Sequence, residues 1–213
     1  FVFMNLGEAK ANKPKEIEKF DELFLKLVNN CIFTTTYRFE NYDYAKAKFN
    51  VDELFWKYFC DIYLEVVKWR VYNGSKQQKE SAFYTLYQSL LTILKLMSPI
   101  TPFITEHIYQ KYFREHEKEK SIHLSKWPTY NKEQELAEEN WRELGWANRF
   151  FIFTEVISKV RSKKTEAKKP MNSPIILTLD KKTYNSLKEF LQDLKNVTNA
   201  KEIKEGEFNV QFA

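Results

Sequence analysis

A continuous helical pattern from Asp43 to about Tyr72 limits the folds that this chain can adopt. Its apolar side chains recur at three- and four-residue intervals, as on one face of an amphipathic helix. They are Ala47, Val51, Leu54, Phe55, Tyr58, Ile62, Val66 and Trp69. At about 1.5 Å per residue, the segment forms a rod of roughly 40 Å. Such a rod requires other long elements to cover its apolar face.

Similar patterns on both sides of this rod predict a helical bundle. One runs from Ile17 to about Phe39, one from Phe83 to Met97, and a fourth begins at Pro102. With only 4 glycines and 6 prolines in 213 residues, the chain has few of the turn residues that an all-β protein uses. We therefore expect residues 1–130 to form an antiparallel bundle of long helices.

Two prolines interrupt the helices of this bundle. Pro99 removes a backbone donor and restricts the preceding residue, so one helix is expected to stop near Met97. Thr101 is a suitable N-cap, and Pro102 then takes the first helical position, where its missing N–H costs nothing. The stretch predicts a corner that apolar side chains on both sides bury. These side chains are Leu94, Met97, Phe103, Ile104 and Ile108.

The last third of the chain has a different pattern. Residues 131–170 predict a connecting helix that begins near Glu133 and runs from acidic to basic residues, which complements a helix dipole. Residues 171–213 combine a strand at 175–180, a short helix and two alternating segments around Gly206. The predicted fold class is mainly α, an antiparallel helical bundle followed by a small β-α-β-β subdomain.

The composition limits the chemistry that the chain can perform. Basic residues exceed acidic residues by five, 34 against 29, which fits either a polyanionic partner or a lysine-rich solvated surface. Cys31 and Cys60 lie in helical patterns, as reduced thiols of a cytoplasmic protein do. No apolar run reaches the roughly 18 to 20 residues of a membrane span. The sequence contains no recognisable phosphate loop, metal-ligand cluster or nucleophile motif, so no catalytic or metal-binding residue is predicted.

Two groups of residues are candidates for nucleic-acid contact. Trp69 lies between Lys68 and Arg70, which combines a stackable ring with phosphate partners, and a core tryptophan with solvated neighbours is the alternative. Near the end of the connecting helix, six basic residues are offset only by Glu166, so this stretch could bind phosphates. The alternative is that these residues only stabilise the negative C-terminal end of the helix dipole. The six are Lys159, Arg161, Lys163, Lys164, Lys168 and Lys169.

The segment from Glu40 to Arg70 resembles the anticodon-binding helical domain of the class I aminoacyl-tRNA synthetases for valine, isoleucine and leucine. That family opens a long helix with Tyr-Asp and then carries Phe-Trp and Phe-Cys-Asp-x-Tyr-Leu-Glu, matched by residues 42–43, 55–56 and 59–65. Its two-proline corner is matched by residues 98–106. FVFMNL at residues 1–6 is similar to the end of the family's linking helix, and residues 121–128 to its segment ending in Trp-Pro.

Within this group, YLEVVKWR and the basic stretch before Asn172 are most similar to the valine enzymes. The isoleucine and leucine enzymes are near alternatives, and a helical protein-interaction scaffold is an alternative of another class. The resemblance implies a fragment of an ATP-dependent ligase whose catalytic and editing domains lie outside this sequence. ATP and magnesium would bind in the catalytic domain, and this chain would hold no cofactor.

The resemblance also implies the partners of the chain. They are the anticodon arm of a tRNA and the enzyme's own catalytic and editing domains, in a monomeric cytoplasmic protein without a membrane partner. From charge and location, one set of RNA contacts is expected on the bundle, namely Arg38, Lys46, Lys68, Trp69 and Arg70. A second set follows the connecting helix, namely Arg161, Lys163, Lys164, Lys168 and Lys169.

Overall fold

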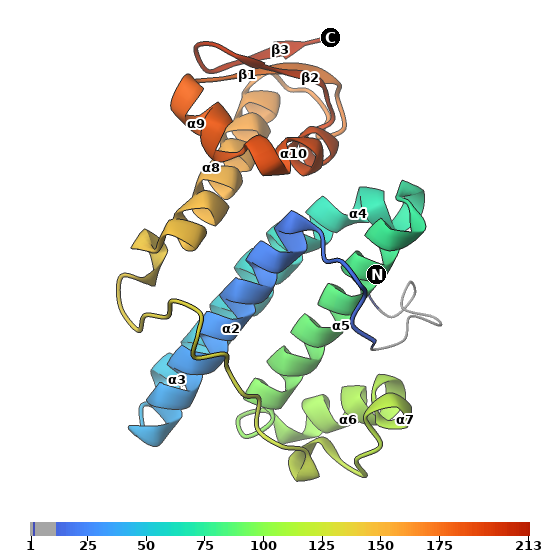
Figure 1. Cartoon of the computed structure of the whole chain (residues 1–213), viewed down its shortest axis with the longest axis vertical. Helices are drawn as coiled ribbons and strands as arrows, with labels where there is room; N and C mark the ends of the chain where they lie inside the picture. The colour runs from blue at the N-terminus through green and yellow to red at the C-terminus, as the bar shows by residue number, and fades with distance from the viewer. Residues whose placement is uncertain (1, 3–11) are drawn as a thin grey trace.

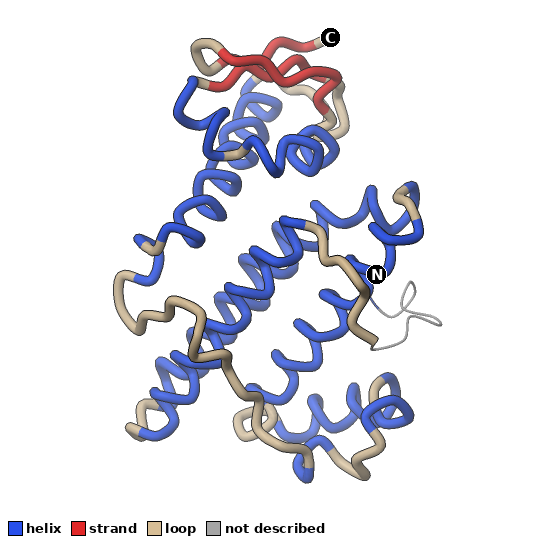
Figure 2. Tube along the Cα trace, in the orientation of Figure 1, coloured by secondary structure: helices blue, strands red, loops and turns tan. Residues whose placement is uncertain are grey.

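The computed structural model describes residue 2 and residues 12–213 of the chain. Most of these residues are helical, and a three-stranded sheet lies at the C-terminal end (Figures 1 and 2). The predicted fold class, a helical bundle followed by a small α/β subdomain, is confirmed. The FVFMNL segment lies outside the described residues apart from Val2.

Three long helical segments form the bundle. The first is α2 (Lys19–Glu40) and the last is α5 (Lys76–Met97). Between them in sequence runs the predicted rod, built without a break from α3 (Tyr44–Asp52), a π-helical segment η1 (Glu53–Tyr63) and α4 (Leu64–Asn73). A long π-helix is rare, because the i to i+5 pattern is usually a single-turn bulge.

The turns of the bundle follow from local chemistry. The Asp43 carboxylate caps α3 by accepting the backbone N–H of Lys46 at 3.2 Å. After α4, a Cβ on Gly74 would lie only 2.5 Å from the Arg70 carbonyl oxygen, so this close approach requires glycine. Ser75 and Gln78 then form a reciprocal capping box that starts α5.

The two-proline corner lies where the sequence places it, but it is only partly buried. Helix α5 ends at Met97 and α6 (Pro102–Tyr112) begins with Pro102 in its first turn. Thr101 is at the N-cap position of α6, but its side chain accepts no hydrogen bond from the first turn of the helix. Its hydroxyl instead donates to the Met97 carbonyl at 3.3 Å. The prediction that Phe103 and Ile104 are buried is wrong, since they are 90% and 54% exposed.

A less regular region joins the corner to the last long helix. It contains the short helix α7 (Arg114–Glu117) and two 3-10 turns, η2 (Ile122–Leu124) and η3 (Trp141–Glu143). The Glu106 carboxylate anchors the chain before η2 by accepting from the Ser121 hydroxyl and the Ile122 N–H, both at 2.9 Å.

The connecting helix begins later than predicted. Helix α8 spans Gly145–Glu166, whereas the acidic segment from Glu133 is an irregular stretch of turns and bends that contacts α2. Polar side chains of α2 explain this difference, because Asn29 and Asn30 accept the backbone N–H groups of Asn131 and Ala137 at 2.7 and 3.1 Å. These side chains pair backbone N–H groups that would form hydrogen bonds within a helix if the segment were helical. The α-helix therefore starts only at Gly145.

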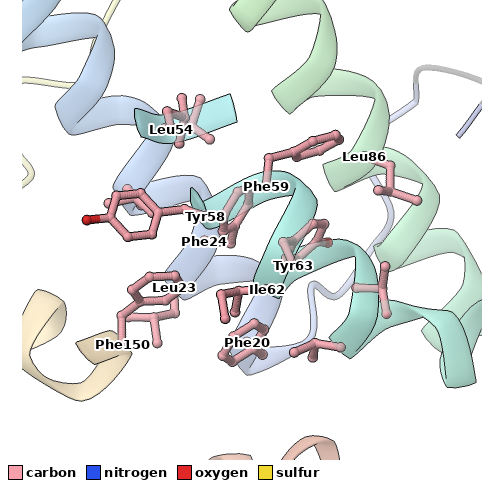
Figure 3. Close-up of a cluster of buried hydrophobic side chains, with 14 of the residues drawn as sticks. Phe20, Leu23, Phe24, Leu54, Tyr58, Phe59, Ile62, Tyr63, Leu86 and Phe150 are labelled. Carbon is pink, nitrogen blue, oxygen red and sulfur yellow. The ribbon is translucent and has the colours of Figure 1, made fainter. Parts of the chain in front are cut away.

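The core joins α8 to the bundle. Phe24 stacks on Tyr63 with ring centroids 4.1 Å apart, and Phe20 contacts Phe153 at 4.5 Å. Figure 3 shows Phe150 beside Phe20 and Leu23 in the same buried cluster. The first half of α8 is therefore a packed element of the core, and its aromatic side chains contribute much of the buried area.

The C-terminal subdomain is a three-stranded sheet with helical turns on one connection. The strands β1 (Ile175–Leu179), β2 (Ala200–Glu205) and β3 (Asn209–Phe212) have the order β2-β1-β3. β1 pairs parallel with β2 and antiparallel with β3, so the two strands around Gly206 flank β1 and do not pair with each other. The crossover contains α9 (Lys181–Ser186), η4 (Lys188–Phe190) and α10 (Leu191–Thr198).

No helix within the described part of the chain combines the length and the apolar character that a membrane crossing requires.

Candidate nucleic-acid interface

Arg70 lies inside the protein. Its side chain is 2% exposed, and its two terminal nitrogens donate to the two carboxylate oxygens of Asp21, each at 2.8 Å. Asp21 also accepts from the hydroxyl groups of Tyr63 at 2.7 Å and Ser81 at 2.5 Å. A guanidinium enclosed in this way cannot reach a phosphate, so the prediction that Arg70 binds tRNA is wrong. Its role is to neutralise a buried carboxylate.

The same arginine joins the bundle to the C-terminal subdomain. Its Nε lies 3.1 Å from Oδ1 of Asp193 on α10, an ion pair without an aligned hydrogen bond. Burial raises the pKa of Asp193 to about 6, and the charges of Asp21 and Glu18 add to this shift, whereas Arg70 opposes it. The Arg70 guanidinium therefore forms ion pairs with two carboxylates, that of Asp21 on α2 and that of Asp193 on α10.

The raised pKa of Asp193 predicts a pH-dependent stability. The folded state binds this proton more tightly than the unfolded state, so the contribution is present below about pH 4 and is lost as the pH rises through about 6. The full change is about 3 kcal/mol. Asp193→Asn keeps an acceptor for Arg70 and removes the titration. Relative to the wild type, we expect the variant to gain unfolding free energy between pH 4.5 and 7.5 in urea titrations.

The exposed carboxylate of Glu189, which pairs with Arg149 at 3.0 Å, provides the matched control. Glu189→Gln should leave the pH dependence of the wild type unchanged, since a surface ion pair contributes little. Parallel pH curves for Asp193→Asn and the wild type would contradict the assignment.

Lys164 is also buried. Its ammonium donates to the carbonyl oxygens of Met171 at 2.7 Å and Thr198 at 2.8 Å, and its side chain is 1% exposed. Burial lowers the pKa of this ammonium. The prediction that Lys164 binds the tRNA backbone is therefore wrong, because the group holds the turn after α8 against the end of α10.

The remaining predicted residues lie in separate regions of the molecule. Arg38 and Lys46 flank the turn between α2 and α3, at the end of the bundle opposite the sheet (Figure 1). Lys68 and Trp69 lie on α4, where Trp69 is partly exposed and Lys68 pairs with Glu65. The basic residues of α8 lie near the sheet. The structure therefore does not bring the two predicted sets together.

The turn between α2 and α3 gathers exposed aromatic residues that the sequence analysis did not select. Tyr42 is 79% exposed and Phe49, one turn beyond Lys46, is 64% exposed. We name this surface the aromatic tip. Its members are Tyr37, Arg38, Tyr42, Tyr44, Lys46 and Phe49. The signal in the sequence was the group of aromatic residues interspersed with Arg38, Lys46 and Lys48 over residues 37–49. Rings and cations together can stack on bases and neutralise phosphates.

The aromatic tip combines stackable rings with positive charge. The Arg38 guanidinium carbon lies 5.5 Å from the centroid of the Tyr37 ring. The rings of Tyr42 and Tyr44 are edge to face, with centroids 6.4 Å apart. Asp43 lies 3.9 Å from Arg38 and 3.1 Å from Lys46. Desolvation works to raise the pKa of Asp43, but hydrogen bonds and charge from Lys46 and Arg38 lower it overall. Asp43 thus orients both cations beside the rings.

The end of α8 forms a basic surface. Lys163 pairs with Glu166 at 2.8 Å, whereas Lys168 and Lys169 form no ion pair with any described residue. Lys168 has a left-handed backbone, with φ of 53°, at the end of the helix. These three exposed cations are suited to phosphate contact, and an RNA role for them stays a prediction.

The geometry describes a helical bundle with an aromatic and cationic tip, and the comparisons give its class. A family model described as the anticodon-binding domain of tRNA ligase matches residues 21–203. Because this match covers most of the chain, the chain belongs to that family of class I tRNA ligase domains. The predicted resemblance is confirmed.

The similar proteins narrow the class further. A valine–tRNA ligase of Orientia tsutsugamushi is 35% identical over 192 residues, covering 85% of this chain and 21% of the relative. The valine–tRNA ligase of Haloarcula marismortui is 32% identical, over 78% of this chain and 17% of the relative. That of Methanothermobacter thermautotrophicus is 29% identical, over 95% of this chain and 22% of the relative. The chain is homologous to part of the valine–tRNA ligases and spans about a fifth of their length.

Proposed function

We propose that this chain is the tRNA-binding portion of a valine–tRNA ligase and that the aromatic tip receives the anticodon loop. The observation that carries the proposal is the gathering of exposed rings and cations at one end of an anticodon-binding fold. Unpaired loop bases can stack on such rings while their edges are read. The cations Arg38 and Lys46 neutralise nearby phosphates, which supplies affinity without sequence information.

The basic end of α8 supports a longer contact with the same RNA. It lies beside the sheet, at the other end of the molecule from the aromatic tip (Figure 1). We propose that Lys163, Lys168 and Lys169 bind phosphates of the tRNA stem, because lysine acts as a point charge for phosphate. Lys68 and Trp69 on α4 are proposed as weaker contributors.

The activity of the whole protein forms part of the proposal. Transfer of valine to tRNA would use ATP and magnesium in catalytic domains beyond this chain, in a monomeric cytoplasmic enzyme. Among the described residues, no group of three or more His, Cys, Asp or Glu side chains is arranged to bind a metal. The isoleucine and leucine ligases stay as alternative sources of the domain.

A binding experiment tests the proposed function. The chain is titrated at moderate salt with valine tRNA, with isoleucine and leucine tRNAs, and with valine tRNA whose middle anticodon base is changed. We expect the tightest binding to valine tRNA and a loss of that preference with the base change, since a misread base costs about 1–3 kcal/mol in direct readout. Equal affinity for all four RNAs would contradict anticodon recognition.

An apolar groove favours one second candidate, a protein-binding scaffold. It has a volume of about 350 Å³ between η1, α5 and α6, and its rim includes the exposed Trp56 and Ile104. Exposed apolar patches of this kind often mark protein contacts. If the chain binds tRNA no better than any other polyanion, and substitution of Trp56 abolishes a protein interaction, the scaffold replaces the tRNA proposal.

A further inference from the structure

A cleft separates the π-helical segment from the connecting helix. It has a volume of about 490 Å³, and its walls are η1 and α8, with Arg142 of η3 at one end. On η1, Lys57, Asp61 and Ile62 are four and five residues apart, which one turn of a π-helix brings to one side. On α8, Phe151, Ser158 and Arg161 follow the spacing of a single α-helical face.

Several polar groups of this cleft have no partner within the described part of the chain. Arg161 uses one terminal nitrogen to donate to the Asp61 carbonyl at 3.2 Å, which ties the two helices together. The rest of its guanidinium, the Asp61 carboxylate and the Ser158 hydroxyl form no hydrogen bond or ion pair with the described residues. Convergent unpaired polar groups beside apolar walls are typical of ligand sites.

A planar group lies at the far end of the cleft. The Arg142 guanidinium is held over the Phe151 ring at 5.3 Å, and it donates to Glu53 at 2.6 Å and to the Tyr58 hydroxyl at 3.1 Å. Its side chain is about half exposed. The same guanidinium also lies over the Trp141 ring at 5.7 Å. A half-exposed guanidinium held beside two aromatic rings can extend their stack to a nucleobase.

A second hollow continues beyond Arg161. It has a volume of about 580 Å³ between α8, α4 and α10, and Arg161 lines both hollows. Asn172, Asn196 and Asn199 lie on its walls. The amide nitrogen of Asn196 is buried and donates to no described atom. Together, the hollows follow α8 from Phe151 to Lys164, roughly 20 Å at the rise of an α-helix.

We infer that this α8 groove binds an unstacked nucleotide of the same RNA, at a site separate from the aromatic tip. Arg161 binds the phosphate, because a guanidinium presents paired donors to phosphate oxygens. The Asp61 carboxylate accepts the exocyclic amine of the base, as acidic side chains accept from cytosine N4. Arg142 supplies the stacking face. This inference rests on the proposed tRNA-binding function.

The charge of the groove favours a nucleotide over a simple anion. Lys57 and Arg142 pair with Glu53, and Glu155 pairs with Lys159. Arg161 and the Asp61 carboxylate are left as the groove's charges without an ion pair among the described residues. A site for phosphate alone has no use for an unpaired carboxylate, which would repel it. A nucleotide presents both an anionic phosphate and base amines, so it satisfies both kinds of group.

Four variants test this inference with valine tRNA as the probe. Arg161→Ala removes the phosphate donor, Arg161→Lys keeps the charge without the paired donors, and Ser158→Phe fills the cleft. Ser162→Phe places the same ring on an exposed position of α8 outside both hollows and serves as the control. Circular dichroism melting of each variant verifies the fold.

We expect Arg161→Ala and Ser158→Phe to weaken tRNA binding about tenfold or more, since charged hydrogen bonds are lost or blocked. Arg161→Lys should weaken it by less, and Ser162→Phe should bind within about twofold of the wild type. Wild-type affinity in both Arg161→Ala and Ser158→Phe would overturn the α8 groove as an RNA site and leave the proposed function standing. Absence of tRNA binding by the wild type would overturn both.

Discussion

Replacing Asp21 with alanine is expected to lower the free energy of unfolding by about 3–5 kcal/mol, because it leaves a buried guanidinium without its main counter-charge. Arg70 is almost fully enclosed and both of its terminal nitrogens donate to Asp21. The Tyr63 and Ser81 hydroxyls would also lose their acceptor. A loss of this size is a large fraction of the roughly 5–15 kcal/mol that stabilises a typical domain.

Urea unfolding followed by circular dichroism measures this effect at pH 7. Tyr63→Phe is the matched control, since it removes one hydrogen bond to Asp21 and keeps the ion pair. We expect it to cost about 1.5–3 kcal/mol, the usual range for a hydrogen bond to a charged group. An Asp21→Ala variant that loses no more than Tyr63→Phe would show that Arg70 finds sufficient compensation from Asp193 alone.

The helices were predictable because their signals are local. The interruption at Pro99 and Pro102, the capping residue Asp43 and the Gly74-Ser75 turn each act within a few residues, and the structure uses all of them. The late start of α8 was not predictable in this way. It depends on Asn29 and Asn30, about one hundred positions earlier in the chain, whose side chains bind the irregular segment before α8.

The π-helical segment explains the error at Arg70. Leu54, Tyr58, Ile62 and Val66 are spaced by four, which fits both a 3.6-residue period and a wider turn. A regular α-helix would place Trp69 on the buried face. The wider turns of η1 change the direction in which the side chains of the next helix, α4, point relative to the core. As a result, α4 buries Arg70 and leaves Trp69 partly exposed.

The candidate site was predictable only in outline. Sequence reasoning selected basic residues on the bundle and along the connecting helix, but it could not separate Lys164 from its neighbours Lys163 and Lys168. The difference lies in two carbonyl oxygens, those of Met171 and Thr198, which the fold brings to one ammonium. The aromatic tip was missed because the mixture of aromatic and basic residues over residues 37–49 does not show which of these rings the fold leaves exposed.

Replacing Tyr42 and Phe49 together with alanine is expected to weaken valine tRNA binding by at least about 30-fold. Stacking of a base on an aromatic side chain contributes about 1–3 kcal/mol, and the double variant removes two exposed rings of the aromatic tip. Both side chains are largely exposed, so the fold should be unaffected. Fluorescence anisotropy with labelled tRNA at several salt concentrations measures the affinity and its salt dependence.

The salt dependence separates stacking from charge neutralisation. The Tyr42 and Phe49 variant should leave the slope of log affinity against log salt unchanged, because it removes no charge. The double variant Lys163→Ala and Lys169→Ala should lower that slope by up to about two, since each phosphate contact contributes roughly 0.7 to 0.9. Tyr72→Ala on α4, also an exposed aromatic residue, serves as the control for nonspecific loss. Equal losses from Tyr72→Ala and from the aromatic tip variant would exclude the tip as the specific base-binding surface.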